Sequence, residues 1–212
     1  MKSPLIVPAL MSVALSACSV VGIRSGTAEP KYTVISTVGP VQIRHYDERI
    51  AAETTITGSV EHARYQGFRR LAGYIFGANR TRTKIAMTAP VAQSASQTIA
   101  MTAPVAQTQT AAGAWTIQFF MPAHFTMETL PVPNDPSVHL VTVPAETYAA
   151  LRFSGLPNPS AVAREQSRLL ALLKSSPWTP VGEPTAWFYD PPWTLPFLRR
   201  NEVAVKVVKS GD

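Results

Sequence analysis

The sequence predicts an α+β fold in which antiparallel strands are covered by two helices. Two observations lead to this prediction. Short strand-like segments flank a helix-like segment before residue 122, and the same order returns after residue 137. Proline is frequent, with 19 residues against 11 glycines, which suits strand edges and corners better than long helices. The repeated order indicates an internal duplication that builds one barrel or one curved sheet.

The composition supports a folded domain with a short appendage. The chain has 212 residues, of which 46% are hydrophobic and 15% are charged, so it can bury a core and is not typical of a disordered protein. The formal net charge is +6, but the basic residues are scattered, and we expect no nucleic-acid partner. A single cysteine excludes an intramolecular disulfide framework and a cysteine-rich metal site.

Residues 1–17 have the pattern of a secretory signal peptide. A positive charge at Lys2 precedes an apolar stretch of about 14 residues, which is too short to cross the hydrocarbon core of a bilayer. The stretch ends in Leu-Ser-Ala-Cys at residues 15–18, which resembles the bacterial lipobox, whose cysteine is diacylated before cleavage. The sequence therefore predicts a lipoprotein with lipid on Cys18. The alternative is an ordinary signal peptide that happens to end in a cysteine.

The lipoprotein prediction fixes the expected domain organisation and location. Residues 18–30 would form a flexible tether after lipidated Cys18, and residues 31–212 would form the folded domain. Two acyl chains anchor a protein stably, whereas one is marginal. We expect the protein to be anchored in the cell envelope. Ser19 stands where an aspartate would act as a retention signal, so in a Gram-negative cell the pattern favours the periplasmic face of the outer membrane.

In the first half, strands are expected at 32–36, 41–46 and 50–57, with Gly39-Pro40 as the first turn. From Val60 the apolar residues recur every three or four positions until Gly77, which predicts a helix capped by Ser59.

A short repeat follows this helix. IAMTAPVAQ occupies residues 85–93 and returns at 99–107, which indicates a local duplication or a hairpin with two similar arms. Isoleucine, methionine and alanine alternate in each copy, so each predicts a strand that ends at Ala-Pro.

The second half repeats the order. Residue 160 is expected to cap a helix that runs to about residue 174, and the predicted strands are 115–121, 138–143, 148–153, 186–189 and 202–208.

Several motifs together resemble the SOUL haem-binding protein family. They follow the family order from about residue 30 to 208, and the doubled MTAPV segment is the most specific of them. The matching pieces are VQIRHY (41–46), AAETT (51–55), GFRRLAGYIFGAN (67–79), KIAMTAPV (84–91), IAMTAPV (99–105), FFMP (119–122), LRFSG (151–155) and RRNEV (199–203). The resemblance implies a distorted antiparallel eight-stranded β-barrel made of two βαβ-like pseudo-repeats and flanked by two helices. It also implies non-covalent binding of haem or another tetrapyrrole.

A haem site needs an apolar slot, cations for the propionates and, in many proteins, an axial ligand. His45 lies in the IRHY motif, where some family members also carry a histidine, and is the predicted iron ligand; the alternative is a surface or pairing histidine. Phe68, Leu71 and Ile75 would form the apolar wall, or would be ordinary core residues. The predicted propionate partners are Arg80, Arg82 and Lys84, which would otherwise form an exposed basic strand edge.

No catalytic motif appears in the sequence. There is no HExxH, GxSxG, Walker loop or GxGxxG, and the carboxylates show no paired pattern, so we expect a binding protein and not an enzyme. The predicted function is a lipid-anchored carrier, buffer or scavenger of haem or a related tetrapyrrole. The alternative is a module on the same barrel that binds another small effector or a protein.

Overall fold

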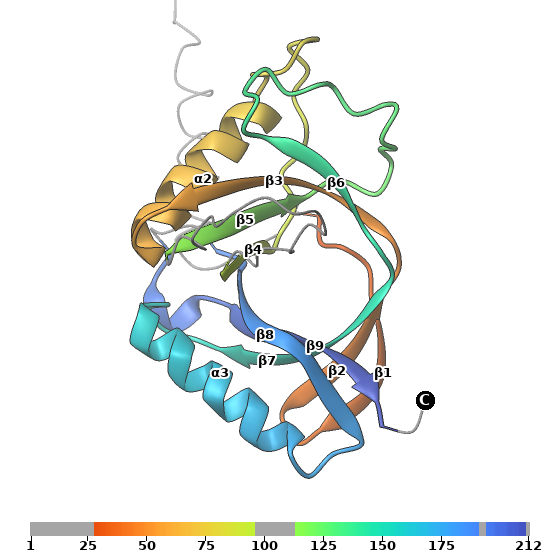
Figure 1. Ribbon diagram of the computed structural model, residues 1–212, viewed down its shortest axis with the longest axis vertical. Coiled ribbons are helices and arrows are strands. Elements are labelled where there is room, and N and C mark those ends of the chain that lie inside the picture. Colours follow the sequence, from red (N-terminus) through yellow and green to blue (C-terminus); the bar gives the residue numbers. More distant parts are fainter. Residues whose placement is uncertain (1–27, 96–112, 191–193, 211–212) are drawn as a thin grey trace, which may run out of the picture.

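The computed structural model describes residues 28–95, 113–190 and 194–210, which form one curved sheet with two helices on its outside (Figure 1). The elements in chain order are β1 Thr33–Val38, β2 Val41–Tyr46, β3 Arg49–Thr57, α2 Val60–Ile75, β4 Val91–Ala95, β5 Ala114–Phe120, β6 His139–Val143, β7 Glu146–Phe153, α3 Pro159–Leu173, β8 Trp178–Phe188, the 3₁₀ helix η1 Pro196–Leu198 and β9 Asn201–Lys209.

The strand order carries an internal symmetry. Neighbouring strands are antiparallel in the order β1-β2-β7-β9-β8-β4-β5-β3-β6. Each strand from β2 to β5 corresponds to the strand four places later in the chain, so that β2 matches β6 and β5 matches β9. Exchanging the members of these four pairs reverses the order of the eight strands. The two halves of the chain therefore have matching topology, as the repeated order of the sequence predicted. They meet where β4 pairs with β8.

The expected closed barrel of eight strands is corrected in two respects. The described part of the chain has nine strands in the sheet, because β1 adds to β2 outside the two matching halves. Within the described residues the sheet is not closed into a barrel either: β1 and β6 are its two edges, and β6 pairs only with β3. The α+β class and the two flanking helices are confirmed.

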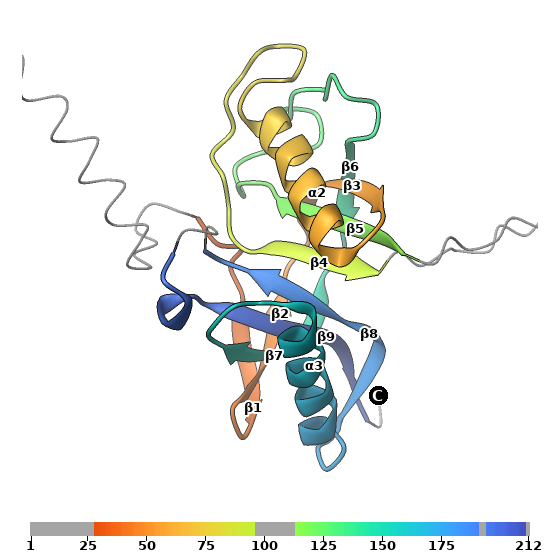
Figure 2. The same ribbon diagram turned by 90° about the vertical axis from the view of Figure 1, so that its left-hand side faces the viewer.

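Each helix covers the outer face of one half of the sheet. In Figure 2, α2 lies over the half that contains β3 and β5, and α3 lies over the half that contains β7, β8 and β9. Leu71, Tyr74 and Ile75 of α2 pack with Ile117 and Phe119 of β5. Leu169 and Leu173 of α3 pack in the same way on apolar residues of the other half, namely Val41, Ile43, Ala149, Leu151, Val203 and Val205.

Side-chain caps fix where the helices begin. The Ser59 hydroxyl accepts a hydrogen bond from the backbone N–H of His62, as the sequence predicted. For α3 the predicted cap, Ser160, is wrong, because the side chain of Asn158 accepts from the backbone N–H of Ala161. Pro159 then stands in the first turn, where its missing N–H costs nothing.

The segment 85–89 is the main local difference from the prediction. It forms no strand, because its backbone groups bond elsewhere: the N–H of Ile85 donates to Ile75 at the end of α2, and that of Ala89 donates to Ala28. The strand of this region, β4, begins after the cis peptide bond between Ala89 and Pro90. The second copy of the repeat and residues 1–27 lie outside the described residues. Among those described, no helix has the length and apolar character of a membrane span.

Candidate functional site

His45 lies near the end of β2, which is paired with β1 on one side and β7 on the other. It is opposite Thr33 of β1 and Thr147 of β7, and its Nδ1 shares a hydrogen bond of 3.2 Å with the Thr147 hydroxyl. Because side chains alternate along a strand, His45 is on the same outer face as Val41 and Ile43. The ring is half-buried and is oriented by the bond to Thr147.

A groove of about 670 Å³ is lined by Thr147, the residue that pairs with His45. It is formed where β7 begins and where β9 ends, and we call it the rim groove; its lining residues are Ile35, Ala145, Glu146, Thr147, Trp178, Lys206, Val207, Val208 and Lys209. His45 is not one of these lining residues; it is linked to the groove through its hydrogen bond to Thr147.

The rim groove combines apolar walls with two cations. Lys206 Nζ is 2.9 Å from Glu146 Oε1, and Lys209 is exposed at the end of β9. The Tyr148 hydroxyl donates to the other oxygen of Glu146 at 2.7 Å. Burial, together with the negative charge of Glu146, raises the pKa of Tyr148, so this phenol stays protonated. The groove therefore presents apolar side chains beside the Lys206–Glu146 ion pair and the exposed Lys209.

The predicted apolar wall on α2 is packed against the sheet. Leu71 and Ile75 are fully buried in the cluster around Phe119. Phe68 is partly exposed, and its ring centroid is 5.3 Å from that of Phe119. These three residues thus lie together, but two of them face the core of their half of the sheet.

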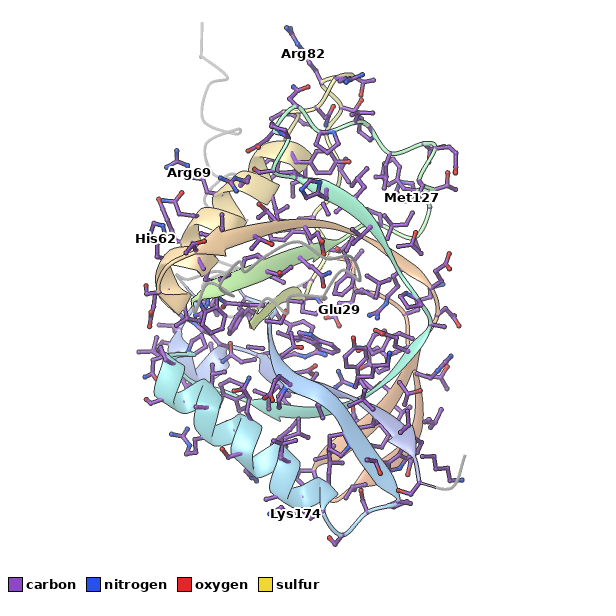
Figure 3. The ribbon with its side chains drawn as sticks, in the orientation of Figure 1. Glu29, His62, Arg69, Arg82, Met127 and Lys174 are labelled. Atoms are coloured by element: carbon purple, nitrogen blue, oxygen red, sulfur yellow. The ribbon has the colours of Figure 1, made fainter. Side chains whose placement is uncertain are left out.

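The predicted propionate partners lie in the loop that follows α2. Arg80, Arg82 and Lys84 are all exposed, and Figure 3 shows Arg82 at the tip of this loop, pointing away from the body. The loop is folded back rather than extended, because buried Asn79 accepts from the backbone N–H of Thr83 and donates to its carbonyl. The structure does not bring these three cations to His45.

A second arrangement, on the inner face of the sheet, was not predicted as a site. Glu202 of β9 is fully buried and accepts from both terminal nitrogens of Arg44, at 2.6 and 3.0 Å. Arg200 Nε and the Tyr189 hydroxyl also donate to this carboxylate, at 3.0 and 2.7 Å. Arg200 in turn pairs with Glu29 at 3.0 Å. We call Arg44, Tyr189, Arg200 and Glu202 the inner charge cluster.

The hydrogen bonds and ion pairs of this cluster keep Glu202 ionised although it is buried. Burial alone would raise the pKa of Glu202, but the hydrogen bonds and charges of Arg44 and Arg200 hold it below its ordinary value. Burial and the neighbouring carboxylate raise the pKa of Tyr189. At neutral pH the phenol therefore donates and the carboxylate accepts. The sequence signal was present, since Arg44, Arg200 and Glu202 fall in the motifs VQIRHY and RRNEV.

A cavity of about 360 Å³ opens beside the inner charge cluster. We call it the inner pocket, and its lining residues are Tyr32, Pro40, Gln42, Arg44, Ala150, Arg152, Arg200 and Glu202. The rest of the inner face is filled by aromatic side chains. Arg49 is one of the groups packed there, with its guanidinium carbon 4.4 Å from the ring centre of Tyr46 and 4.7 Å from that of Phe120. The inner pocket is thus a smaller and more polar space than the rim groove.

Iron would have to be held without a protein metal cluster. Within residues 28–95, 113–190 and 194–210, no three His, Cys, Asp or Glu side chains gather as metal ligands. A tetrapyrrole supplies its own four nitrogens, so one axial imidazole is a sufficient protein ligand.

Comparison with known proteins gives a family match and a set of similar folds. The family model described as SOUL heme-binding protein matches residues 27–206. No curated protein matches the chain. Among solved structures, the C-terminal domain of EcmrR is similar with a TM-score of 0.57 and 12% identity, over 84% of this chain and 98% of that one.

Two proteins from Listeria innocua also share the fold. One is described as an uncharacterized conserved protein, with a TM-score of 0.58 and 11% identity over 79% of this chain and 92% of its own. The other is described as a hydrolase, with a TM-score of 0.53 and 10% identity over 82% of this chain and 94% of its own. At such identities the likeness concerns the fold alone.

Proposed function

The chain belongs to the SOUL haem-binding protein family, and from this premise we propose that it binds haem or a related tetrapyrrole in the rim groove, as a carrier, buffer or scavenger held at the cell envelope by lipid on Cys18. The observation that carries the proposal is a groove of about 670 Å³ that is lined by Thr147, the hydrogen-bond partner of His45. Its volume is in the usual range for small-molecule sites, about 300–1,000 Å³.

The walls of the rim groove suit the two sides of such a ligand. Ile35, Trp178 and Val208 offer apolar surface to the macrocycle. Lys209 would offer an ammonium group to one propionate, and Lys206 would do so in competition with Glu146. These lysines replace Arg80, Arg82 and Lys84 in the proposal, because the latter three lie in the loop after α2, away from His45.

His45 is the proposed axial ligand. If Nδ1–H donates to the Thr147 hydroxyl, the lone pair of Nε2 is free to coordinate iron. Ligating histidines usually have such a bond from the other ring nitrogen, which fixes the tautomer and the ring orientation. Haem would supply the iron chemistry; the protein would bind and orient it. The proposal is of a binding protein and not an enzyme.

A haemin titration tests this function. Residues 18–212 with Cys18→Ser contain every described residue and cannot be acylated at position 18. We expect a saturable Soret shift, an altered iron spectrum in His45→Ala, and affinity about tenfold weaker in Thr147→Val. His139→Ala is the matched control, since this exposed histidine begins β6 at the opposite edge of the sheet. The absence of a saturable shift would exclude haem as ligand, and an unchanged spectrum in His45→Ala would exclude His45 as the iron ligand.

The inner pocket supports a second candidate function. Its volume of about 360 Å³ suits a small molecule, and the inner charge cluster gives it fixed polar walls. A small polar effector would fit the inner pocket, and in that case the protein would be an effector-binding module instead of a haem carrier. Thermal-shift measurements with metal-free porphyrin and with small carboxylates separate the two, because only binding to the native state raises the melting temperature.

A further inference from the structure

Four large apolar side chains are exposed together on two neighbouring loops. Leu156 follows β7, and its side chain is 57% exposed; the other three surround η1, where Leu195 is 38%, Phe197 70% and Leu198 37% exposed. The loops touch, because the backbone N–H of Gly155 donates to the carbonyl of Pro196 at 2.9 Å. We call these four residues the apolar patch.

The exposure belongs to a structured loop. The N–H of Leu198 donates to the carbonyl of Leu195 at 2.9 Å, and Arg199 Nε donates to that of Thr194 at 2.8 Å. Thr194 is buried, and the side-chain amide of Asn201 holds the carbonyl of Gly155 at 3.1 Å. A fixed loop that keeps phenylalanine and leucine side chains in water is typical of an interaction surface.

The start of the described chain indicates what covers this surface. Glu29 forms an ion pair with Arg200, which lies two residues after Leu198, and Ala28 bonds to Ala89. Figure 2 shows the first described residues and η1, the short blue helix, on the same side of the molecule. Cys18 precedes Ala28 by ten residues, so extended chain would reach at most about 35 Å. Lipid on Cys18 would thus keep a bilayer within reach of the apolar patch.

A basic side chain accompanies the apolar patch. Arg199 directly follows η1 and is half-buried, with its Nε donating to the carbonyl of Thr194, whereas Arg152 of β7 lines the inner pocket. An anionic lipid surface attracts a residue such as Arg199, whereas apolar side chains beside it enter the boundary between headgroups and acyl chains.

We propose that the apolar patch inserts into the lipid surface and that Arg199 faces the headgroups. That the patch contacts a bilayer, and not a protein, rests on the lipid anchor at Cys18 in the proposed function. The patch would orient the domain on the membrane, which a flexible tether alone cannot do.

Vesicle flotation tests the proposal. Residues 18–212 with Cys18→Ser are mixed with vesicles of phosphatidylethanolamine and phosphatidylglycerol, and the floated fraction gives the partition coefficient. We expect Phe197→Ser to reduce it about tenfold, and Leu156→Ser to reduce it in the same direction. Phe76→Ser is the matched control, since Phe76 is another well-exposed phenylalanine, at the end of α2 and outside the apolar patch. Circular dichroism checks that the variants are folded.

Three results would overturn the proposal. The parent chain could fail to float, the three variants could lose the same amount of binding, or the patch could bind a second copy, seen as a dimer in sedimentation velocity that Phe197→Ser dissociates. Acylation of Cys18 is measured separately, by the mass of the protein isolated from membranes. A missing lipid would contradict the anchor, while flotation of the Cys18→Ser chain would still report on the apolar patch.

Discussion

Glu202 is a carboxylate placed in a strand whose other buried residues are mostly apolar. Its neighbours Val203 and Val205 face α3, whereas Glu202 faces the inner side of the sheet, where Arg44 and Arg200 meet it. A buried carboxylate is tolerated only when its lone pairs are satisfied, and here two guanidinium groups and one phenol satisfy them. The inner charge cluster therefore joins β2, β9 and the segment before β9 into one polar unit.

Glu202→Gln should lower the free energy of unfolding by about 3–5 kcal/mol, because it leaves the buried guanidinium of Arg44 without its counter-charge. Urea unfolding measures the change. Glu183→Gln is the control: this glutamate is exposed on β8, and a change within about 0.5 kcal/mol is expected. Equal losses in the two variants would mean that the inner charge cluster contributes no special stability.

Because of the same carboxylate, we expect the free energy of unfolding to fall at acidic pH. The folded-state pKa of Glu202 lies below its ordinary value of 4.5, so the unfolded chain binds this proton first as the pH falls. The stabilisation is complete above about pH 4.5 and is lost as the pH falls through the lowered folded-state pKa. Unfolding free energies measured from neutral to acidic pH should therefore fall less steeply in Glu202→Gln.

For single residues, the sequence indicated which side chains could bind a ligand, but it did not predict which residues lie beside them in the fold. A motif pointed to His45, whose hydrogen-bond partner Thr147 lines the rim groove, and the role of His45 as a ligand stays a prediction. The sequence could not predict that Lys206 and Lys209 line the groove, because they come from the end of the chain. Arg80, Arg82 and Lys84 alternate as in a strand, but the hydrogen bonds of Asn79 fold their segment into a loop.

Among the elements, α2 depends on a glycine at its contact with β5. Gly67 is buried, and a Cβ built there would lie 2.8 Å from the Cβ of Ile117, closer than real side chains approach. Gly73 of the same helix has only Ala78 near it, at 4.0 Å. The two positions share a helix and differ in the space that each offers.

Gly67→Ala should therefore destabilise the protein by about 1 kcal/mol or more, because the cost of overpacking exceeds the gain in helix propensity. Gly73→Ala should instead raise stability by up to about 1 kcal/mol, since it gains propensity without a clash. Thermal unfolding followed by far-UV circular dichroism compares the two. A rise in melting temperature for Gly67→Ala would show that α2 can move away from β5 at little cost.

Elements with a clear period were predicted within a few residues, and those shaped by their neighbours were not. The prediction for β2 is confirmed at both ends. β8 is longer than predicted: it begins at Trp178 and contains Pro180 and Pro184. Proline is tolerated there because, among the described residues, β4 pairs only with Ala186–Phe188 and the earlier part of β8 has β9 as its one partner strand. The sequence of β4 has a low strand propensity. The strand is stabilised by pairing with β5 on one side and β8 on the other, where the two halves meet.

For the whole molecule, the strands place the two proposed surfaces at opposite ends. β7 runs from Glu146 at the rim groove to Phe153, just before Leu156 of the apolar patch. β9 runs from Asn201, just after η1, to Lys209 at the rim groove. Eight or nine extended residues span about 25–30 Å. A domain that rests on the bilayer through the apolar patch would therefore open its rim groove away from the lipid, toward the aqueous compartment.

Hydrogen–deuterium exchange tests this orientation without a ligand. Adding vesicles should slow exchange at residues 154–156 and 195–199, where lipid would exclude water, and should leave residues 206–210 unchanged, because the rim groove would stay in solvent. In Phe197→Ser the protection at both loops should be lost, while exchange in the rest of the sheet should match the parent chain. Protection of residues 206–210 by vesicles would mean that the rim groove faces the bilayer, so that any tetrapyrrole would have to enter it from the lipid.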